Sequence, residues 1–228
     1  MTSSASFLAA LQVADSALPI GRFVHSYGLE AWLRGHGDAN PDTLSELVEA
    51  VVCEAVAPLD GILIARAHAA QDLGTLLALD AQATARRLAP SSRAASQSCG
   101  RQLARLAPQL APADTLLSRL CASVSAGETD GNLPVVSGAL MRALGVSARD
   151  AVLVELRGAA AALLSSAVRL GAMSPMRSQV ALARMAPALE EAAERALGGD
   201  ASQTSSTAPE LELYAMTHRR ADARLFAT

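Results

Sequence analysis

Apolar residues recur every three or four positions over most of the chain, and signals for helix starts precede these runs. Thr43–Glu46 (TLSE) has the form of a capping box, and Ser147 precedes another apolar run. Pro134 and Pro175 stand where a first-turn proline is tolerated, because its missing N–H would have no helical partner. The pattern predicts an all-α fold: one compact, bundle-like domain of about nine or ten helices.

Two stretches interrupt the helical pattern. Residues 127–132 (GETDGN) predict a turn-forming loop between helices. Residues 198–209 (GGDASQTSSTAP) have the small, polar composition of a flexible linker. We therefore expect a helical domain over 1–197, a flexible linker over 198–209, and a C-terminal tail over 210–228 that docks onto a partner.

The composition is that of a globular chain with a substantial core. The chain has 228 residues, of which 51% are hydrophobic and 18% charged. At this length folding buries about 70–75% of the surface that the unfolded chain exposes. The net charge of −3 argues against a nucleic-acid partner, since such binders usually carry a basic stripe. All 19 basic residues are arginines, which excludes lysine nucleophiles and a phosphate-binding lysine.

Cysteine usage and hydropathy predict a location in the cytoplasm. Cys53, Cys99 and Cys121 are an odd, widely spaced set, which is typical of a reducing compartment. The first residues lack a basic region, and Asp15 interrupts their apolar stretch, so we expect no secretory signal. The apolar stretch 151–170 contains a glutamate and two arginines, so we expect no transmembrane helix and no membrane partner.

No residue pattern in the chain indicates catalysis or a bound cofactor. His25 and Ser26 are neighbours, and neighbours on a helix point about 100° apart, so they would not form a nucleophile–base pair. The histidines have no metal-type spacing, and the chain has no nucleotide-binding or calcium-binding motif. We expect no catalytic residue, no resident metal and no cofactor; a transient metal site at an oligomer interface stays open.

The aromatic residues lie near the two termini: Phe7, Phe23, Tyr27, Trp32, Tyr214 and Phe226. Two interpretations fit this distribution. The aromatic side chains could cap the ends of an aliphatic core. Alternatively, both termini form a docking surface, because aromatic residues and arginine are enriched at binding hot spots.

The most distinctive polar segment follows Pro19 and Gly21, which break the chain before a predicted helix. On a helical wheel Arg22, Ser26 and Glu30 share one polar sector, and small and apolar residues form a narrow face on the opposite side. This arrangement fits either an ordinary amphipathic helix or a partner-binding surface.

Residues 15–30 (DSALPIGRFVHSYGLE) resemble the opening signature of the UreF family of urease accessory proteins. In that family a Leu/Phe-Pro-x-Gly turn leads into a helix of the form His/Trp/Tyr-Ser-x-Gly-Leu-Glu. Four further blocks resemble the family in its own order: 91–103 (SSRAASQSCGRQL), 131–145 (GNLPVVSGALMRALG), 165–182 (SSAVRLGAMSPMRSQVAL) and 218–228 (HRRADARLFAT). Each block alone is weak, but five blocks in order, spread over the whole chain, are specific.

Three positions depart from the family pattern. Arg22 stands where a small residue is common, and Asn132 replaces a histidine that commonly follows Gly131. The chain ends in Ala-Thr after 224–226, where Arg-Ser is typical. Asn132 counts against a metal ligand in this loop.

The resemblance implies a non-catalytic, all-α homodimer that acts in urease maturation. Such proteins bind a second accessory protein, UreD (also called UreH), and a nickel-carrying GTPase, UreG, which they recruit and regulate. The assembly delivers nickel to apo-urease. The alternatives are a stand-alone nickel metallochaperone and a helical interaction module of another assembly.

We expect the partner-binding residues in both terminal segments. They are Pro19, Gly21, Arg22, His25, Ser26, Tyr27, Glu30, Tyr214, Arg224, Leu225 and Phe226. For the homodimer, we expect helix 151–170 to leave an apolar face uncovered in the monomer, as exposed apolar patches commonly mark interfaces.

Overall fold

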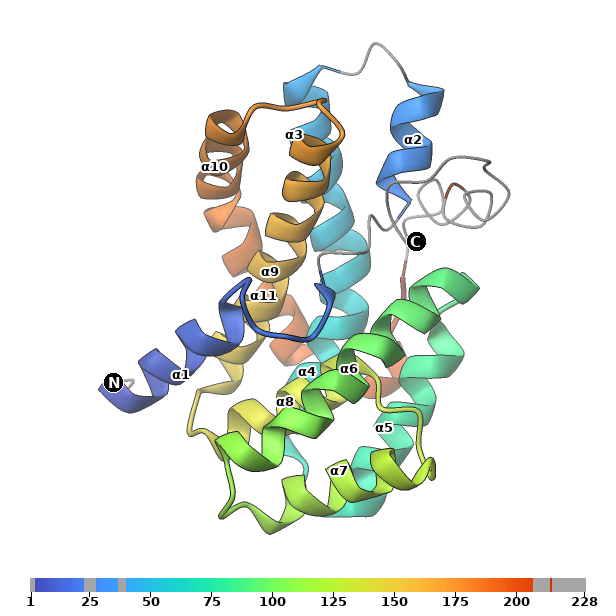
Figure 1. The fold of residues 1–228 in the computed structure, drawn as a ribbon, viewed down its shortest axis with the longest axis vertical. Coiled ribbons are helices and arrows are strands. Elements are labelled where there is room, and N and C mark those ends of the chain that lie inside the picture. The colour runs from blue at the N-terminus through green and yellow to red at the C-terminus, as the bar shows by residue number, and fades with distance from the viewer. Residues whose placement is uncertain (1–2, 23–27, 37–39, 207–213, 215–228) are drawn as a thin grey trace.

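The computed structural model describes residues 3–22, 28–36, 40–206 and 214, and every secondary-structure element in these residues is helical (Figure 1). The predicted all-α fold is confirmed. The elements are α1 (Ser4–Ala14), α2 (Leu29–Gly35), α3 (Pro41–Val51), the π-helix η2 (Val52–Gly61), α4 (Ile62–Ala69), α5 (Leu73–Arg86), α6 (Pro90–Leu110), α7 (Thr115–Ala126), α8 (Leu133–Ala143), α9 (Ala148–Arg169), α10 (Pro175–Arg184), α11 (Ala186–Gly198) and the short 3-10 helix η3 (Ala201–Gln203).

Most of the predicted helix starts are found where the sequence signals place them. The Ser147 hydroxyl accepts a hydrogen bond from the backbone N–H of residue 150, and Pro134 and Pro175 lie in the first turns of α8 and α10. The predicted capping box at Thr43 is wrong. Helix α3 begins three residues earlier, because the Asn40 side chain caps it and accepts from the N–H groups of residues 42 and 43, each at 2.9 Å.

The buried residues form two clusters that meet where α4 crosses α8. One cluster surrounds α9 and includes side chains of α3, η2, α10 and α11. The other lies among α5, α6, α7 and α8 (Figure 1). Ile64 belongs to the first cluster and Leu63 to the second. The crossing is close: a Cβ atom on Gly138 of α8 would lie 2.6 Å from the carbonyl oxygen of Ile64.

Helix α9 is mainly a core helix, and it leaves much less apolar surface uncovered than the sequence predicts. Eleven of its residues are buried, among them Val152, Leu156, Leu163 and Leu164. In the described residues α9 is the one helix that is long and apolar enough to cross a membrane, but 61% of that apolar window is buried inside the fold. Neighbouring helices therefore cover most of the apolar surface that the sequence assigns to an interface, and a half-buried remainder lines a groove beside α1.

The predicted loop 127–132 is found between α7 and α8 and is fastened to α5 by one buried carboxylate. Asp80 accepts hydrogen bonds from the backbone N–H groups of Gly131 and Asn132, at 2.9 and 2.6 Å. The Asn132 amide also donates to Asp80, at 3.1 Å, and to Thr84, at 2.9 Å. Asn132 is fully buried, so its side chain serves the loop's structure.

The family-like blocks 91–103 and 131–145 contact each other directly. The Ser96 hydroxyl accepts a hydrogen bond from the backbone N–H of Leu133, at 3.3 Å. A Cβ atom on Gly100 would lie 2.1 Å from the carbonyl oxygen of Gly131, so only glycine admits the loop backbone here. The serine and glycine of the first block therefore hold the start of α8.

Candidate partner-binding surface

The segment around residues 19–30 does not form the single helix predicted from Arg22. Helix α2 begins at Leu29, and Gly28 before it has a φ of 87°. A left-handed residue interrupts an α-helix, which requires negative φ throughout. Pro19 is exposed in a turn and Gly21 also has a positive φ, of 80°. His25, Ser26 and Tyr27 lie outside the described residues.

Glu30 is an internal support of α2. Its side chain pairs with Arg34 one helical turn later, at 2.7 Å between Oε1 and Nη2. The Glu30 side chain is 3% exposed, whereas that of Arg34 is 47% exposed. The buried carboxylate thus orients a guanidinium that reaches the surface. The sequence pattern predicts a partner contact at Glu30 and none at Arg34.

The first and last parts of the described chain meet at the end of α2. The rings of Trp32 and His36 stack with centroids 4.3 Å apart, and Tyr214 packs edge-on against His36 at 6.0 Å. A Cβ atom on Gly35 would lie 2.9 Å from the Tyr214 hydroxyl oxygen. Two segments that the sequence names as docking candidates thus share one location. Arg224, Leu225 and Phe226 lie outside the described residues.

Residues 199–206, which we call the strap, are fastened to α5 and η2. Gln82 donates to the Thr204 hydroxyl at 3.0 Å, and Arg86 donates to the carbonyl of Ser202 at 3.2 Å. The N–H of Ser205 donates to the carbonyl of Pro58 at 3.2 Å. Composition predicts flexibility from residue 198, but the strap makes specific contacts. Residues 207–209 of the predicted linker lie outside the described residues.

Arg22 anchors the N-terminal segment to α9. Its guanidinium forms an ion pair with Glu155, whose side chain is 6% exposed. One turn along α9, a Cβ atom on Gly158 would lie 2.7 Å from Nη1 of Arg22, so the glycine leaves room for the guanidinium. Burial raises the pKa of Glu155, the charge of Arg22 opposes that shift, and nearby Asp60 adds to it.

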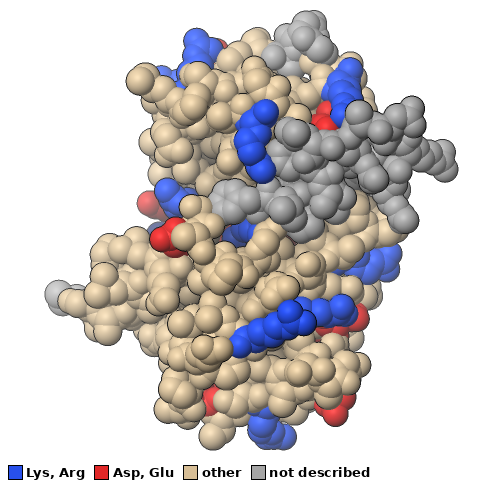
Figure 2. All heavy atoms as spheres, in the orientation of Figure 1, with Lys and Arg blue, Asp and Glu red and all other residues tan. Residues whose placement is uncertain are grey.

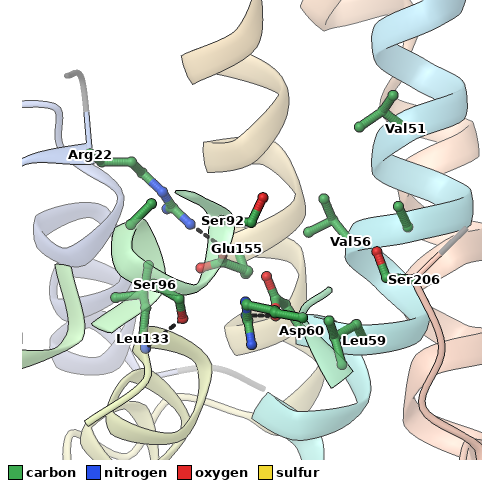
Figure 3. Close-up of a pocket in the computed structure, with 13 residues that line it drawn as sticks. Arg22, Val51, Val56, Leu59, Asp60, Ser92, Ser96, Leu133, Glu155 and Ser206 are labelled. Carbon is green, nitrogen blue, oxygen red and sulfur yellow. Dashed lines mark hydrogen bonds and ion pairs between the residues drawn. The ribbon is translucent and has the colours of Figure 1, made fainter. Parts of the chain in front are cut away.

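A second ion pair, between Arg87 and Asp60, lies beside the first. We call Arg22, Asp60, Arg87 and Glu155 the buried charge cluster. The four side chains line one cavity of about 110 Å³, which Ser206 at the end of the strap also lines (Figure 3). The cluster therefore joins the N-terminal segment, η2, α9 and the strap at one place.

A second candidate surface lies on α1, which projects from the body (Figure 1). Its Phe7, Leu8 and Leu11 are 56%, 63% and 52% exposed. Phe7 and Leu11 line a groove of about 820 Å³, whose other wall comes from α9, α10 and α11. Helix α1 has no charged residue, and the projecting arm carries no charged colour in Figure 2.

The described residues offer little for metal or thiol chemistry. Among them, no group of three His, Cys, Asp or Glu side chains could hold a metal ion. Burial raises the pKa of Cys99 and of Cys121 to about 11, so both thiols stay protonated at neutral pH. His68 bonds through Nε2 to the carbonyl of Val146, at 2.7 Å. These side chains serve the core.

We expect Arg22→Ala to destabilise the protein by about 3 kcal/mol at neutral pH, because it leaves Glu155 buried without its partner. Burial raises the folded-state pKa of Glu155 above its ordinary value of 4.5, and loss of Arg22 raises it further. The folded variant then holds a proton that the unfolded chain releases, so stability falls as pH rises through that window.

Urea denaturation at pH 5 and pH 8 tests this expectation. The deficit relative to wild type should be larger at pH 8, and Arg22→Ala combined with Glu155→Gln should lose most of the pH dependence. An equal deficit at both pH values would contradict the assignment of Glu155 as the titrating group.

Comparisons with known proteins agree with the sequence signatures. The UreF family model matches residues 39–186. Urease accessory protein UreF 2 of Brucella canis is 33% identical over 223 residues, which cover 95% of this chain and 89% of that protein. Urease accessory protein UreF of Yersinia enterocolitica is 29% identical over 220 residues, 95% of this chain and 96% of that protein. From the family match and this full-length similarity, the chain belongs to the UreF family of urease accessory proteins.

Proposed function

We propose that the chain is a non-catalytic scaffold of urease maturation in the cytoplasm. In this role it binds a UreD/UreH-type accessory protein, recruits and controls a UreG-type GTPase, and so takes part in nickel delivery to apo-urease. Membership of the UreF family supports a role in urease maturation. The observation that carries the scaffold role is the contact of Tyr214 with the end of α2, which gathers two candidate docking segments into one surface.

The proposed docking surface consists of α2, Tyr214 and the segments that follow and precede them. His36 and Tyr214 supply half-buried aromatic surface beside the buried Trp32, and Arg34 supplies an oriented guanidinium. Tyrosine and arginine are among the residue types that most often carry binding energy. Pro19 and Gly21 form the turn that precedes this surface, and Arg22 ties that turn to α9. We keep His25, Ser26 and Tyr27 as further proposed contacts.

The tail residues Arg224, Leu225 and Phe226 are proposed as contacts of the UreD/UreH-type partner. They follow Tyr214 closely in sequence, so a partner seated on α2 is within reach of them. Large anchoring side chains suit such a contact, because ordering any short segment on binding costs conformational entropy.

We expect Arg34→Ala to weaken binding of at least one accessory partner by about tenfold to a hundredfold, as loss of a partly desolvated charge contact does. Glu30→Ala should weaken binding of the same partner, because the Arg34 guanidinium then loses the carboxylate that orients it. The double variant should bind this partner no more weakly than Arg34→Ala alone, since both substitutions remove the same interaction.

Isothermal titration of each partner measures these effects, with thermal melting as a check on folding. Arg195→Ala is the matched control: Arg195 is 51% exposed and also pairs with a glutamate one turn away, Glu191. Additive losses, or wild-type affinity of Arg34→Ala for both partners, would contradict the proposed docking surface.

We further propose that the chain forms a two-fold symmetric homodimer through α1 and its groove. Three large apolar side chains stand exposed on a helix without charges, beside an open groove that two of them line. A two-fold axis would let each copy's α1 cover the other's groove, which makes the surface self-complementary. The absence of charge on α1 lets two copies approach without repulsion.

We expect Phe7→Asp combined with Leu11→Asp to convert the dimer into a folded monomer, because two carboxylates would be buried without partners. Light scattering at micromolar concentration measures the mass, and circular dichroism checks the fold. Leu88→Asp is the control, since Leu88 is 66% exposed and does not line this groove. A wild-type monomer, or a dimer that persists in the double variant, would overturn this interface.

A further inference from the structure

A groove between α3 and α10 belongs to neither of the surfaces described so far. Its volume is about 580 Å³, and three of the chain's six methionines line it. Met173 and Met185 are buried and form the floor, while Met176 on the α10 wall is 80% exposed. Val180, one turn beyond Met176, is 45% exposed. We call this the methionine groove.

The two walls of the methionine groove carry opposite charges. Asp42, Glu46 and Glu49 lie on the α3 wall, at spacings that put them on one face of the helix. Arg177 and Arg184 lie on the α10 wall, two turns apart on one face. Within the described part of the chain, none of these five side chains has an ion-pair partner. The acidic and basic rows face one groove without neutralising each other.

We propose that the methionine groove binds an amphipathic helix of a partner protein. The apolar edge of that helix lies on the methionine floor, with basic residues towards α3 and acidic residues towards α10. Methionine suits such a floor, because its flexible thioether adapts to different apolar side chains. Helix-in-groove binding takes its affinity from apolar anchors, and the flanking charges set the register.

The spacing of the charges sets the length of the bound helix. Asp42 and Glu49 are seven residues apart, as are Arg177 and Arg184. At 1.5 Å per residue each row spans about 10 Å, so a helix of about three turns reaches all five charges.

A second copy of this chain fits the groove less well than a partner helix. A copy that presents α10 would pair its arginines with the acidic wall. The same arginines would then lie near Arg177 and Arg184 of the other copy, and like charges at short range repel. A helix with charges of both signs satisfies both walls.

Synthetic helical peptides of about four turns test the proposal on the full-length protein. All share a leucine and methionine stripe; one has basic and acidic flanks, one has two basic flanks, and one has two acidic flanks. Fluorescence anisotropy should show saturable binding that is strongest for the mixed peptide. Met176→Asp should weaken it about tenfold or more, whereas Leu88→Asp, the same change at a residue outside the groove, should not.

Charge reversal of one wall gives the decisive comparison. Arg177→Glu combined with Arg184→Glu makes both walls acidic, so the peptide with two basic flanks should become the preferred one. Both arginines are exposed, and circular dichroism checks that the variant folds. The absence of saturable binding, equal binding of all three peptides, or an unchanged preference in the reversed variant would overturn the proposal. Self-association that Met176→Asp abolishes would also overturn it, by making a second copy the occupant.

Discussion

Helices α4 and α8 cross with the backbone of Ile64 lying directly against Gly138, and the rest of the molecule depends on that contact. The two buried clusters meet at this crossing, one around α9 and one around α8. Between Trp32 and Tyr214 the chain has no aromatic residue, so apart from Trp32 its core is built mainly from aliphatic side chains. Small side chains fill a core only where helices approach closely. A wider crossing would separate the two halves.

This packing places α9 next to the N-terminal segment that carries Arg22 and close to the end of the strap. Its Glu155 and Gly158 receive Arg22 from the N-terminal segment, and the strap ends beside the same cavity. Removing a buried charge from its partner is costly, so the buried charge cluster fixes where the N-terminal segment leaves the body. The proposed docking surface thus depends on helices far from it in sequence. On this proposal, affinity for partners is coupled to the stability of the core through α9.

The helices and the family could be predicted from the sequence, because helical periodicity and short signature blocks are local properties. The arrangement of the docking residues could not. A helical wheel places Arg22 and Glu30 on one face only if the helix is continuous, and the left-handed backbone of Gly28 interrupts it. Composition predicts a flexible linker from 198, but it does not encode the bonds from Gln82 and Arg86 to the strap.

Neither the burial of α9 nor the contacts of His36 could be predicted from the sequence. An apolar helix has the same sequence pattern whether neighbours cover one face or every face, so the sequence alone overstates the apolar surface that residues 151–170 leave uncovered. A lone histidine carries no local signal, and the edge-on contact of Tyr214 with His36 joins residues from far apart in the chain. The structure explains why asparagine at position 132 suits this loop, since its amide donates a hydrogen bond to Asp80 of α5.

The central claim is that α2 and the segment around Tyr214 form one surface for an accessory partner. Hydrogen–deuterium exchange of the full chain, alone and with the UreD/UreH-type protein, tests it most directly. The account predicts that backbone amides of α2 and of residues around Tyr214 gain protection together, while amides of α5 and α7 do not change. Protection of only one of the two segments, or of neither, in a complex that demonstrably forms would contradict the claim.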